Sequence, residues 1–316
     1  MKISIIVSSY NYEKYLSKTL DSLLNQTWKN WEAIVVDDGS SDGSLDLIRK
    51  YSEKDSRIKL LQHVDGRNRG LARTLQLGIL ESSYEWISFC ESDDWWEPTF
   101  LQEIVNAIKG NSEYELFFSD VILEGSSPSM EDHCNFIRQH FRNGGNAFEL
   151  HQKKINSVPT FSAVVVKRSI LESCNFDAYF PPSLDMWLWC QLSIKTKFYF
   201  LDVPLSHWRQ HEISYMKQSV IPDKIDWDIV HEFHRRMDSI LELDAKEENL
   251  ERENGSNQNS ETIFVGMTEK QVIFYNRFIK YISILLILIP GIKKKFRRQY
   301  LLSFHHGKNS KKRNME

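Results

Sequence analysis

The chain has 316 residues, of which 41% are hydrophobic and 26% charged, enough apolar content for one large α/β domain with an accessory region. Its four cysteines are scattered without a Cys-x-x-Cys pair, which argues against a disulfide framework and favours a reducing compartment. The net charge is −3, yet nine Lys/Arg and no acid lie between Lys293 and Arg313; without these and Glu316, 31 basic and 42 acidic residues give −11. An acidic body disfavours nucleic acid as a partner and leaves the basic tail to meet an anionic surface.

Strand and helix patterns alternate through the first 123 residues. Short β-branched runs predict strands at 3–10, from 31 into the acid-rich turn that ends at 44, and at 58–64, 85–94 and 114–123. Apolar residues at helical spacing predict helices at 13–27, 44–55, 70–82 and 100–110. This alternation predicts an α/β fold with a mostly parallel sheet flanked by helices.

The remaining chain is more varied. Residues 124–158 are polar and are expected to be irregular, 161–173 reads as strand then helix, and 183–196 as a helix. An amphipathic helix is predicted at 224–243, followed by a charged Asn/Ser-rich linker at 246–262. The helical pattern of 266–292 has an apolar core of about 12 residues, short of the ~20 that span a bilayer. We expect no signal peptide, because Met1-Lys2 runs directly into the first strand.

Polar clusters follow three of the predicted strands: Ser8–Asn11, Asp37–Asp42 and Glu91–Asp94. In parallel α/β sheets a ligand sits outside the carboxyl ends of the strands, so these clusters predict a site at that edge. The chain has no G-x-x-x-x-G-K-[ST] and no G-x-G-x-x-G after its first strand. A P-loop ATPase and a dinucleotide-binding domain are therefore disfavoured.

Three stretches together resemble the successive motifs of the family 2 glycosyltransferases with the GT-A fold: "IIVSSYNYEKYLSKTLDSLLNQTWKNWEAIVVDDGSSDGS", "NRGLARTLQLGI" and "FCESDDWWEP". The resemblance covers residues 1–110 strongly and 155–215 more loosely. It implies inverting transfer of a sugar from a nucleotide-diphosphate donor, with Mg²⁺ or Mn²⁺. It also implies a catalytic domain at 1–220, with a Rossmann-like nucleotide-binding half at 1–123 and an acceptor side at 124–220. Residues 221–316 would form a helical C-terminal region.

The resemblance assigns the donor to residues of the first two clusters and the third helix. Tyr10, with Ser8 and Asn11, would meet the nucleoside, and Asp38 would accept a hydrogen bond from an imide N–H such as that of uracil, which favours a UDP-sugar. Arg73 would face the pyrophosphate. The alternative is that Asn11 lies near a helix N-cap, that the acids make Asx-turns, and that Arg73 is a solvated surface residue.

The acidic turn after the fourth predicted strand is the expected metal site. Asp93 matches the acid that usually binds the metal, a hard divalent cation that prefers oxygen ligands. Glu91 stands where the family usually has Asp, and would meet the ribose or a metal-bound water through a longer side chain; the role of Asp94 is open. The alternative is a solvated acidic turn that caps the helix after Pro98.

Two later segments complete the expected site. Asp185 is the expected general base, although Leu184 replaces the acid that usually precedes it, and Asp185 is alternatively a helix N-cap. Arg209 and His211 of "HWRQH" match family residues that contact donor phosphates or metal, so His211 joins Asp93 as an expected metal ligand. Five tryptophans offer either a sugar-stacking platform or core packing: Trp95, Trp96, Trp187, Trp189 and Trp208.

The C-terminal segment 266–313 combines an apolar run with a cationic cluster. We expect it to bind an anionic leaflet, the alternative being a helix that packs on the domain or on a partner chain. The expected protein is thus cytoplasmic and peripheral on the inner face of the cell membrane. Its acceptor would be a glycan or lipid-linked glycan of a surface polysaccharide.

Two other functions compete with this one. A non-catalytic, membrane-docked nucleotide-sugar-binding or scaffold protein on the same fold is suggested by the departures at Glu91, Leu184 and Gln76. A nucleotidyltransferase also needs metal and carboxylates, but would want a Gly-rich basic loop near the first strand, which "SSYNYEKY" does not offer.

Overall fold

The structure is a computed structural model that describes residues 1–125, 128–177, 183–211 and 232–241, all of which belong to one compact unit of the chain. The strands are β1 (Ile3–Ser9), β2 (Trp31–Asp37), β3 (Ile58–Gln62), β4 (Trp86–Phe89), β5 (Trp95–Trp96), β6 (Leu116–Glu124), β7 (Val164–Lys167) and β8 (Phe198–Arg209). The helices are α1 (Glu13–Leu24), α2 (Ser44–Lys54), α3 (Leu71–Leu80), α4 (Phe100–Gly110), α5 (Pro128–Arg142), α6 (Ala147–Gln152), α7 (Arg168–Glu172) and α8 (Leu184–Ser193). A short 3₁₀ turn, η1 (Phe161–Ala163), precedes β7.

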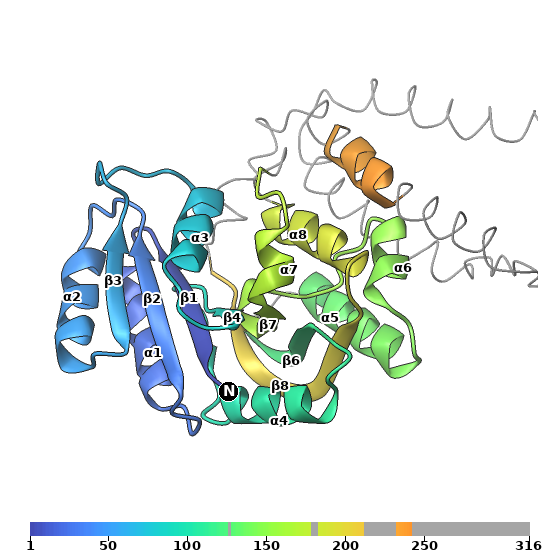
Figure 1. Ribbon diagram of the computed structural model, residues 1–316, viewed down its shortest axis with the longest axis horizontal. Coiled ribbons are helices and arrows are strands. Elements are labelled where there is room, and N and C mark those ends of the chain that lie inside the picture. The colour runs from blue at the N-terminus through green and yellow to red at the C-terminus, as the bar shows by residue number, and fades with distance from the viewer. Residues whose placement is uncertain (126–127, 178–182, 212–231, 242–316) are drawn as a thin grey trace, which may run out of the picture. The chain divides into compact units, whose positions relative to one another are not determined.

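The eight strands form one sheet in the order β3-β2-β1-β4-β7-β6-β8-β5 (Figure 1). Parallel pairing joins β3, β2, β1 and β4, and also β6 with β8. β7 and β5 run antiparallel to their neighbours. The predicted mostly parallel α/β sheet is confirmed, and the carboxyl ends of β1, β2 and β4 meet at one edge.

Helices cover both faces of the sheet, which explains why β1 and β2 are apolar at nearly every position. Along β1, Ile5 and Val7 pack with Leu16 and Leu20 of α1, in a core that also includes α2 and α4. Ile6 points to the other face, into a core with α3, α5, α6, α7 and α8. Each fully buried aliphatic side chain of this kind contributes about 1.5–3 kcal/mol to folding.

Two local expectations were wrong. Residues 124–158 contain α5 and α6 rather than irregular chain, since a few apolar side chains such as Ile137 and Leu150 are enough to dock them. The predicted strand 85–94 ends at Phe89, and Cys90–Asp94 form a turn before β5, which pairs with β8. The pairing partner of β5 lies more than a hundred residues away, so local pattern could not indicate this strand.

Part of the predicted amphipathic helix 224–243 is described, as the helical segment 232–241. Phe233, Met237 and Leu241 recur at a spacing of four and are buried in the same core as α6 and α8. Phe233 lies 6.0 Å from Trp187 between ring centres, and Lys154 contacts Asp238. This segment therefore packs on the same face of the sheet as α6 and α8.

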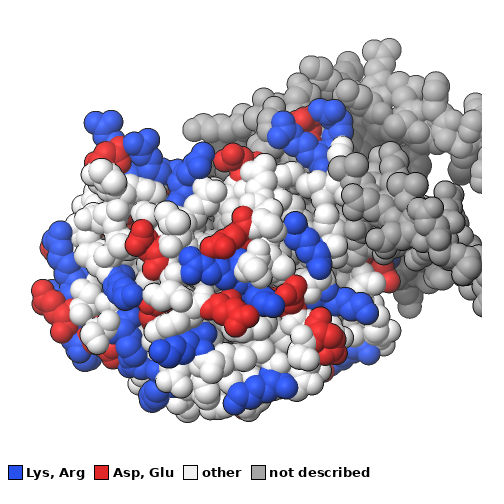
Figure 2. Space-filling view, viewed as in Figure 1, with Lys and Arg blue, Asp and Glu red and all other residues white. Residues whose placement is uncertain are grey.

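Other predictions fall outside the described residues. These are the boundary at 220, the linker 246–262 and the segment 266–313. Within the described part of the chain, no helix has the length and apolarity needed to cross a membrane. Figure 2 shows Lys and Arg interspersed with Asp and Glu over the visible face, without a field of one sign.

Gly78 sets how closely α3 approaches the sheet. A Cβ at this position would lie 2.5 Å from Ile6 Cγ2 and 3.3 Å from Val36 Cγ2. We expect Gly78→Ala to lower the free energy of unfolding by about 1–3 kcal/mol, because the buried strand side chains must shift. Urea unfolding measures this.

Gly110→Ala is the matched control. Gly110 ends α4, and a Cβ there meets nothing within 4 Å. That substitution should leave stability unchanged or raise it by up to ~1 kcal/mol, because Ala favours the helix. Equal losses for both variants would contradict the packing role of Gly78.

Candidate functional site

The turns after β1, β2 and β4 are tied together by hydrogen bonds, as the position of the polar clusters predicts. The backbone N–H of Asn11 donates to Ser40 Oγ at 3.0 Å, and Asn11 Oδ1 accepts from the Ser41 N–H at 2.7 Å. Ser92 Oγ donates to the Ser8 carbonyl at 2.5 Å. Asn11 has a φ of 58°, a left-handed conformation that Asn tolerates, and it bridges two turns rather than capping α1.

Asp38 holds the start of α3 against this edge. Its Oδ1 accepts from the Arg69 N–H at 2.6 Å and its Oδ2 from the Gly70 N–H at 3.0 Å. His63 Nε2 lies 3.3 Å from Oδ1. Since an ionised carboxylate offers about four acceptor positions, room is left for one more donor. The predicted contact of Asp38 with a nucleobase remains a prediction.

The other predicted donor residues differ in exposure. Tyr10 is 45% exposed, so its ring is open to a ligand, whereas Ser8 is half-buried. The Arg73 side chain is 61% exposed, donates to Gln76 and lies 3.6 Å from Asp177. A phosphate contact by Arg73 therefore stays a prediction.

All three acids in the turn contact other parts of the chain: Asp93 faces His211, while Asp94 and Glu91 bind residues 160 and 162 and the end of β8. Asp94 is 1% exposed; its Oδ1 accepts from the Arg209 N–H at 2.9 Å and its Oδ2 from Ser162 Oγ at 2.7 Å. Glu91 Oε2 accepts from Thr160 Oγ1 at 2.8 Å. Neither acid caps α4, whose N-cap Thr99 makes no side-chain cap bond. Thr160 and Ser162 belong to no recognisable motif, so the sequence analysis could not predict that they bind the acidic turn.

The turn gathers three carboxyl groups where burial opposes their ionisation. Burial raises the pKa of Glu91 to about 8, and the nearby Asp93 charge acts in the same direction. Burial also raises the pKa of Asp94 well above its ordinary value, and Asp93 and Glu91 add to this. A positive group placed here would relieve the repulsion.

Asp93 and His211, the two predicted metal ligands, lie side by side. Asp93 Oδ2 lies 2.9 Å from His211 Nε2, within hydrogen-bond distance, and the buried His211 Nδ1 has no hydrogen-bond partner among the residues that the structure describes. A carboxylate oxygen and a ring nitrogen are both atoms that a divalent cation accepts as ligands, so the pair fits part of a ligand set. No group of three or more His, Cys, Asp or Glu among the described residues is arranged to hold a metal. Further ligands would have to come from a substrate or water.

Aromatic rings fix the residues at the end of β8. The centres of the Tyr15 and His211 rings lie 4.5 Å apart, and the Arg209 guanidinium lies 4.5 Å from the centre of the Tyr15 ring. The same guanidinium is 4.7 Å from the Trp95 ring, which stacks on His207 at 4.6 Å and 14°. We call these five residues the β8 stack.

His207 anchors the far end of the β8 stack. Its Nδ1 lies 2.8 Å from Glu124 Oε1 and its Nε2 lies 2.8 Å from Glu97 Oε1. Both ring nitrogens of His207 therefore lie within hydrogen-bond distance of a carboxylate. The stack thus runs from Glu124 at the end of β6 and Glu97 just after β5 to the predicted metal ligands.

Asp185, the predicted base, lies in the first turn of α8, and Ser183 rather than Asp185 is the N-cap. Asn156 Nδ2 donates to Asp185 Oδ2 at 2.6 Å. Burial raises the pKa of Asp185, while the Met186 N–H and the Asn156 amide lower it in part. The charge of Asp185 helps raise the pKa of Glu91, so Asp185 and the acidic turn share one electrostatic environment. No sequence pattern pointed to Asn156.

The tryptophans mainly pack. Trp95, Trp96, Trp187 and Trp189 are each less than 10% exposed, and Trp96 Nε1 donates to the Ser162 carbonyl. For these four, the core-packing alternative holds over an open sugar platform. Trp208 is half-buried against Val121 and Cys134.

Comparison with known proteins identifies relatives of this chain. The family model that matches is "Glycosyl transferase family 2", over residues 4–172. Glycosyltransferase GlyA of Streptococcus pneumoniae is 39% identical over 107 residues, 34% of this chain and 15% of that protein. Putative glycosyltransferase EpsH of Bacillus subtilis is 39% identical over 103 residues, 33% of this chain and 29% of its own length. The matched region thus spans less than a third of each of these relatives.

Solved structures show the same fold. S. aureus TarS 1-349 in complex with UDP-GlcNAc has a TM-score of 0.56 at 18% identity, covering 90% of this chain and 84% of that one. The mannosyltransferase PcManGT of Pyrobaculum calidifontis, in complex with GDP-Man and Mn²⁺, has a TM-score of 0.54 at 12% identity, covering 90% and 85%. At these identities the likeness establishes the fold.

The β8 stack makes Tyr15 a test of how the site is held. We expect Tyr15→Leu to lower the free energy of unfolding by about 1–3 kcal/mol, because a smaller side chain loses ring contacts and leaves a void. Tyr15→Phe keeps the ring and should change stability by less than about 0.5 kcal/mol. Chemical unfolding of the two variants measures both, and equal losses would refute the stacking role.

Proposed function

Because the chain belongs to glycosyl transferase family 2, we propose that it is a metal-dependent inverting glycosyltransferase. It moves a sugar from a nucleotide-diphosphate donor, preferably a UDP-sugar, to a hydroxyl of an acceptor. The Asp93–His211 pair carries this proposal, since the two side chains lie 2.9 Å apart at the edge where Tyr10 and Asp38 also lie. The titles of the similar structures, which name UDP-GlcNAc and GDP-Man, support a nucleotide-sugar donor.

The donor would lie across the carboxyl ends of β1, β2 and β4. Tyr10 would stack on the base, and Asp38 would accept its imide N–H with the acceptor position it has left. Ser8 and Asn11 line the same turn. Arg209, held by Tyr15 and Trp95, would meet the phosphates.

Asp93 and His211 would hold the metal ion. Bound Mg²⁺ or Mn²⁺ would neutralise charge on the departing diphosphate. Glu91 and Asp94 act differently, because they are occupied by Thr160, Ser162 and the end of β8. They position the loop that presents Asp93.

Asp185 would act as the base. Inversion is a single displacement, so one carboxylate must take the acceptor proton as the acceptor oxygen attacks the anomeric carbon. Burial raises the pKa of Asp185, which strengthens it as a base, and Asn156 orients its carboxylate.

A bacterial surface polysaccharide is the proposed setting. Relatives include proteins named for such roles, among them a putative teichuronic acid biosynthesis glycosyltransferase of Bacillus subtilis, 34% identical over 101 residues. The acceptor would be a glycan or lipid-linked glycan. Cytoplasmic location at the inner membrane face is proposed from the basic segment after residue 292 alone.

Asp93 and Asp185 can be separated by experiment. We expect Asp93→Ala to weaken Mn²⁺-dependent binding of UDP-sugars at least tenfold, because it removes a metal ligand. Asp185→Asn should keep donor binding within about twofold and lower transfer by 10²–10⁴, because it removes only the base. Calorimetry with and without EDTA, and a transfer assay over donor and acceptor panels, measure these effects.

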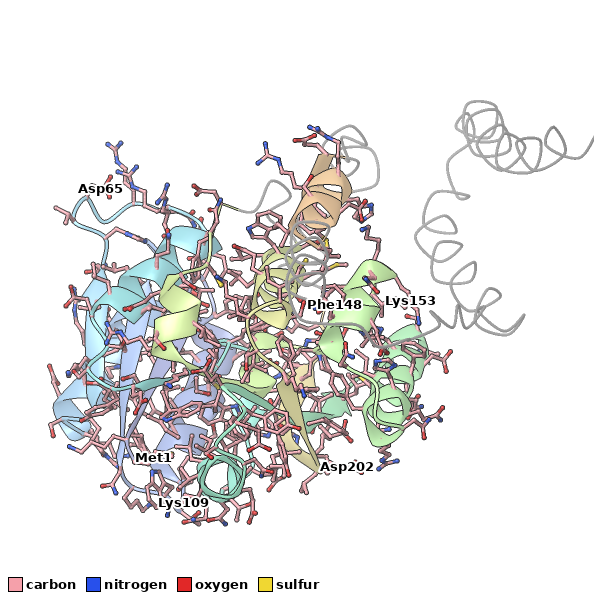
Figure 3. The ribbon with its side chains drawn as sticks, turned by 45° about the vertical axis from the view of Figure 1, so that its right-hand side comes forward. Met1, Asp65, Lys109, Phe148, Lys153 and Asp202 are labelled. Atoms are coloured by element: carbon pink, nitrogen blue, oxygen red, sulfur yellow. The ribbon has the colours of Figure 1, made fainter. Side chains whose placement is uncertain are left out.

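Asp202→Asn is the control. Asp202 is exposed and pairs with Arg142. Figure 3 labels it well away from Asp65, which marks the loop that leads from β3 to α3. This surface pair should matter little to donor binding or transfer. Donor binding by the wild type without turnover on any acceptor would instead favour the non-catalytic scaffold.

The pH profile should report Asp185. The base must be ionised, so kcat/KM should fall as pH drops through a pKa that burial places above the ordinary value of 3.8. The Asn156 amide lowers that pKa, so Asn156→Ala should move the acid limb of the profile to higher pH and leave the alkaline limb in place. If the acid limb of the kcat/KM profile lies at the same pH in Asn156→Ala as in the wild type, another group is the base.

A further inference from the structure

Lys18 and Arg209 lie beside the same ring. The Lys18 Nζ lies 3.1 Å from the centre of the Trp95 ring, and the Arg209 guanidinium lies 4.7 Å from it. Lys18 comes from the exposed side of α1 and Arg209 from the end of β8. Trp95 therefore gathers two cations from segments that are far apart in sequence.

The side chains of this cation pair contact rings rather than carboxylates. Among the residues that the structure describes, neither Lys18 nor Arg209 forms an ion pair with a carboxylate, and their charged groups lie over Trp95 and Tyr15. Glu124 is the acid whose charge reaches Lys18, but its Oε1 is engaged by His207. Desolvation lowers the pKa of Lys18, and the charge of Arg209 lowers it further. The pair thus carries a repulsion that a bound anion would relieve.

The pair also adjoins the predicted metal ligands. Thr19, next to Lys18, donates from Oγ1 to the carbonyls of Ser92 and Asp94, on either side of Asp93. The Arg209 N–H binds the Asp94 carboxylate. α1 and β8 are therefore both bonded to the turn that presents Asp93.

We propose that Lys18 is a second cation of the leaving-group site, and that with Arg209 it binds the diphosphate of the donor and of the released nucleotide. The inference rests on the proposed function. As the acceptor oxygen bonds to the anomeric carbon, the bond from that carbon to the diphosphate oxygen breaks and its electron pair stays on the oxygen. The acceptor proton goes to Asp185. Lys18 and Arg209 then face the negative charge that the diphosphate gains.

Nucleoside diphosphates and monophosphates separate this role from a structural one. We expect Lys18→Gln to weaken UDP binding about five- to tenfold in EDTA, because one charge-assisted contact is lost. UMP, which lacks the second phosphate, should bind within about twofold of wild type. The slope of log affinity against log salt for UDP should also become shallower. If the wild type binds GDP more tightly than UDP, the same comparison is made with GDP and GMP.

Lys54→Gln is the matched control. Lys54 is also an exposed helix lysine beside an aromatic ring, 5.9 Å from the centre of Tyr51, but it ends α2 at the opposite edge of the sheet. It should leave UDP affinity unchanged, and both variants should unfold at the wild-type temperature.

Three outcomes decide the matter. Weaker UDP binding with unchanged UMP binding supports the proposal. Unchanged UDP affinity in Lys18→Gln, or an equal loss of affinity for UDP and UMP, overturns the proposal. Lys18 would then have only a structural role, packing over the Trp95 ring. If the wild type binds no nucleoside diphosphate, with or without Mn²⁺, the proposed function fails and this inference falls with it.

Discussion

Buried Asp94 joins three segments that are far apart in the sequence, and the candidate site depends on that junction. Its two carboxylate oxygens accept from the Arg209 N–H and from Ser162 Oγ, and its backbone carbonyl accepts from Thr19 Oγ1. A carboxylate buried in this way costs several kcal/mol unless its acceptors are satisfied. The two bonds that satisfy the carboxylate fix η1 and the end of β8 around the acidic turn, and the bond from Thr19 to the backbone carbonyl fixes α1 there.

This junction divides the work of two adjacent acids. With Asp94 turned inward, Asp93 is left to face His211, two residues beyond Arg209. Both the Tyr15 ring and the Trp95 ring lie beside the Arg209 guanidinium, so Arg209 and the predicted metal ligands are positioned by the same few contacts. Stacking suits this task, because a planar guanidinium packs on aromatic faces while keeping its N–H groups for a ligand.

The glutamate in place of the usual aspartate also acquires a physical meaning. Glu91 Oε2 accepts a hydrogen bond from Thr160, which also approaches Asp94 Oδ2 at 3.2 Å. One extra methylene lets this carboxylate reach the segment before η1. Glutamate at position 91 is thus compatible with an intact Asp93–His211 pair, and its presence does not by itself indicate a loss of catalytic activity.

The amino-acid pattern alone determined the alternation of buried strands and helices and the edge at which polar residues gather. These follow from periodicity and from short motifs, which act over a few residues. The family resemblance, and not periodicity, named Asp93 and His211 as metal ligands, which stays a prediction, and the structure shows that the two side chains lie 2.9 Å apart. The pattern did not indicate α5, α6 or β5, whose formation depends on docking to distant strands. Only the tertiary structure decided that Asp94 binds Ser162 and the end of β8, that Asn156 holds Asp185, and that Lys18 and Arg209 both lie beside Trp95. The reason is that the orientation of a carboxylate or a cation is set by the hydrogen-bond donors and rings around it. Here those groups belong to distant segments, some of them more than a hundred residues away in the sequence.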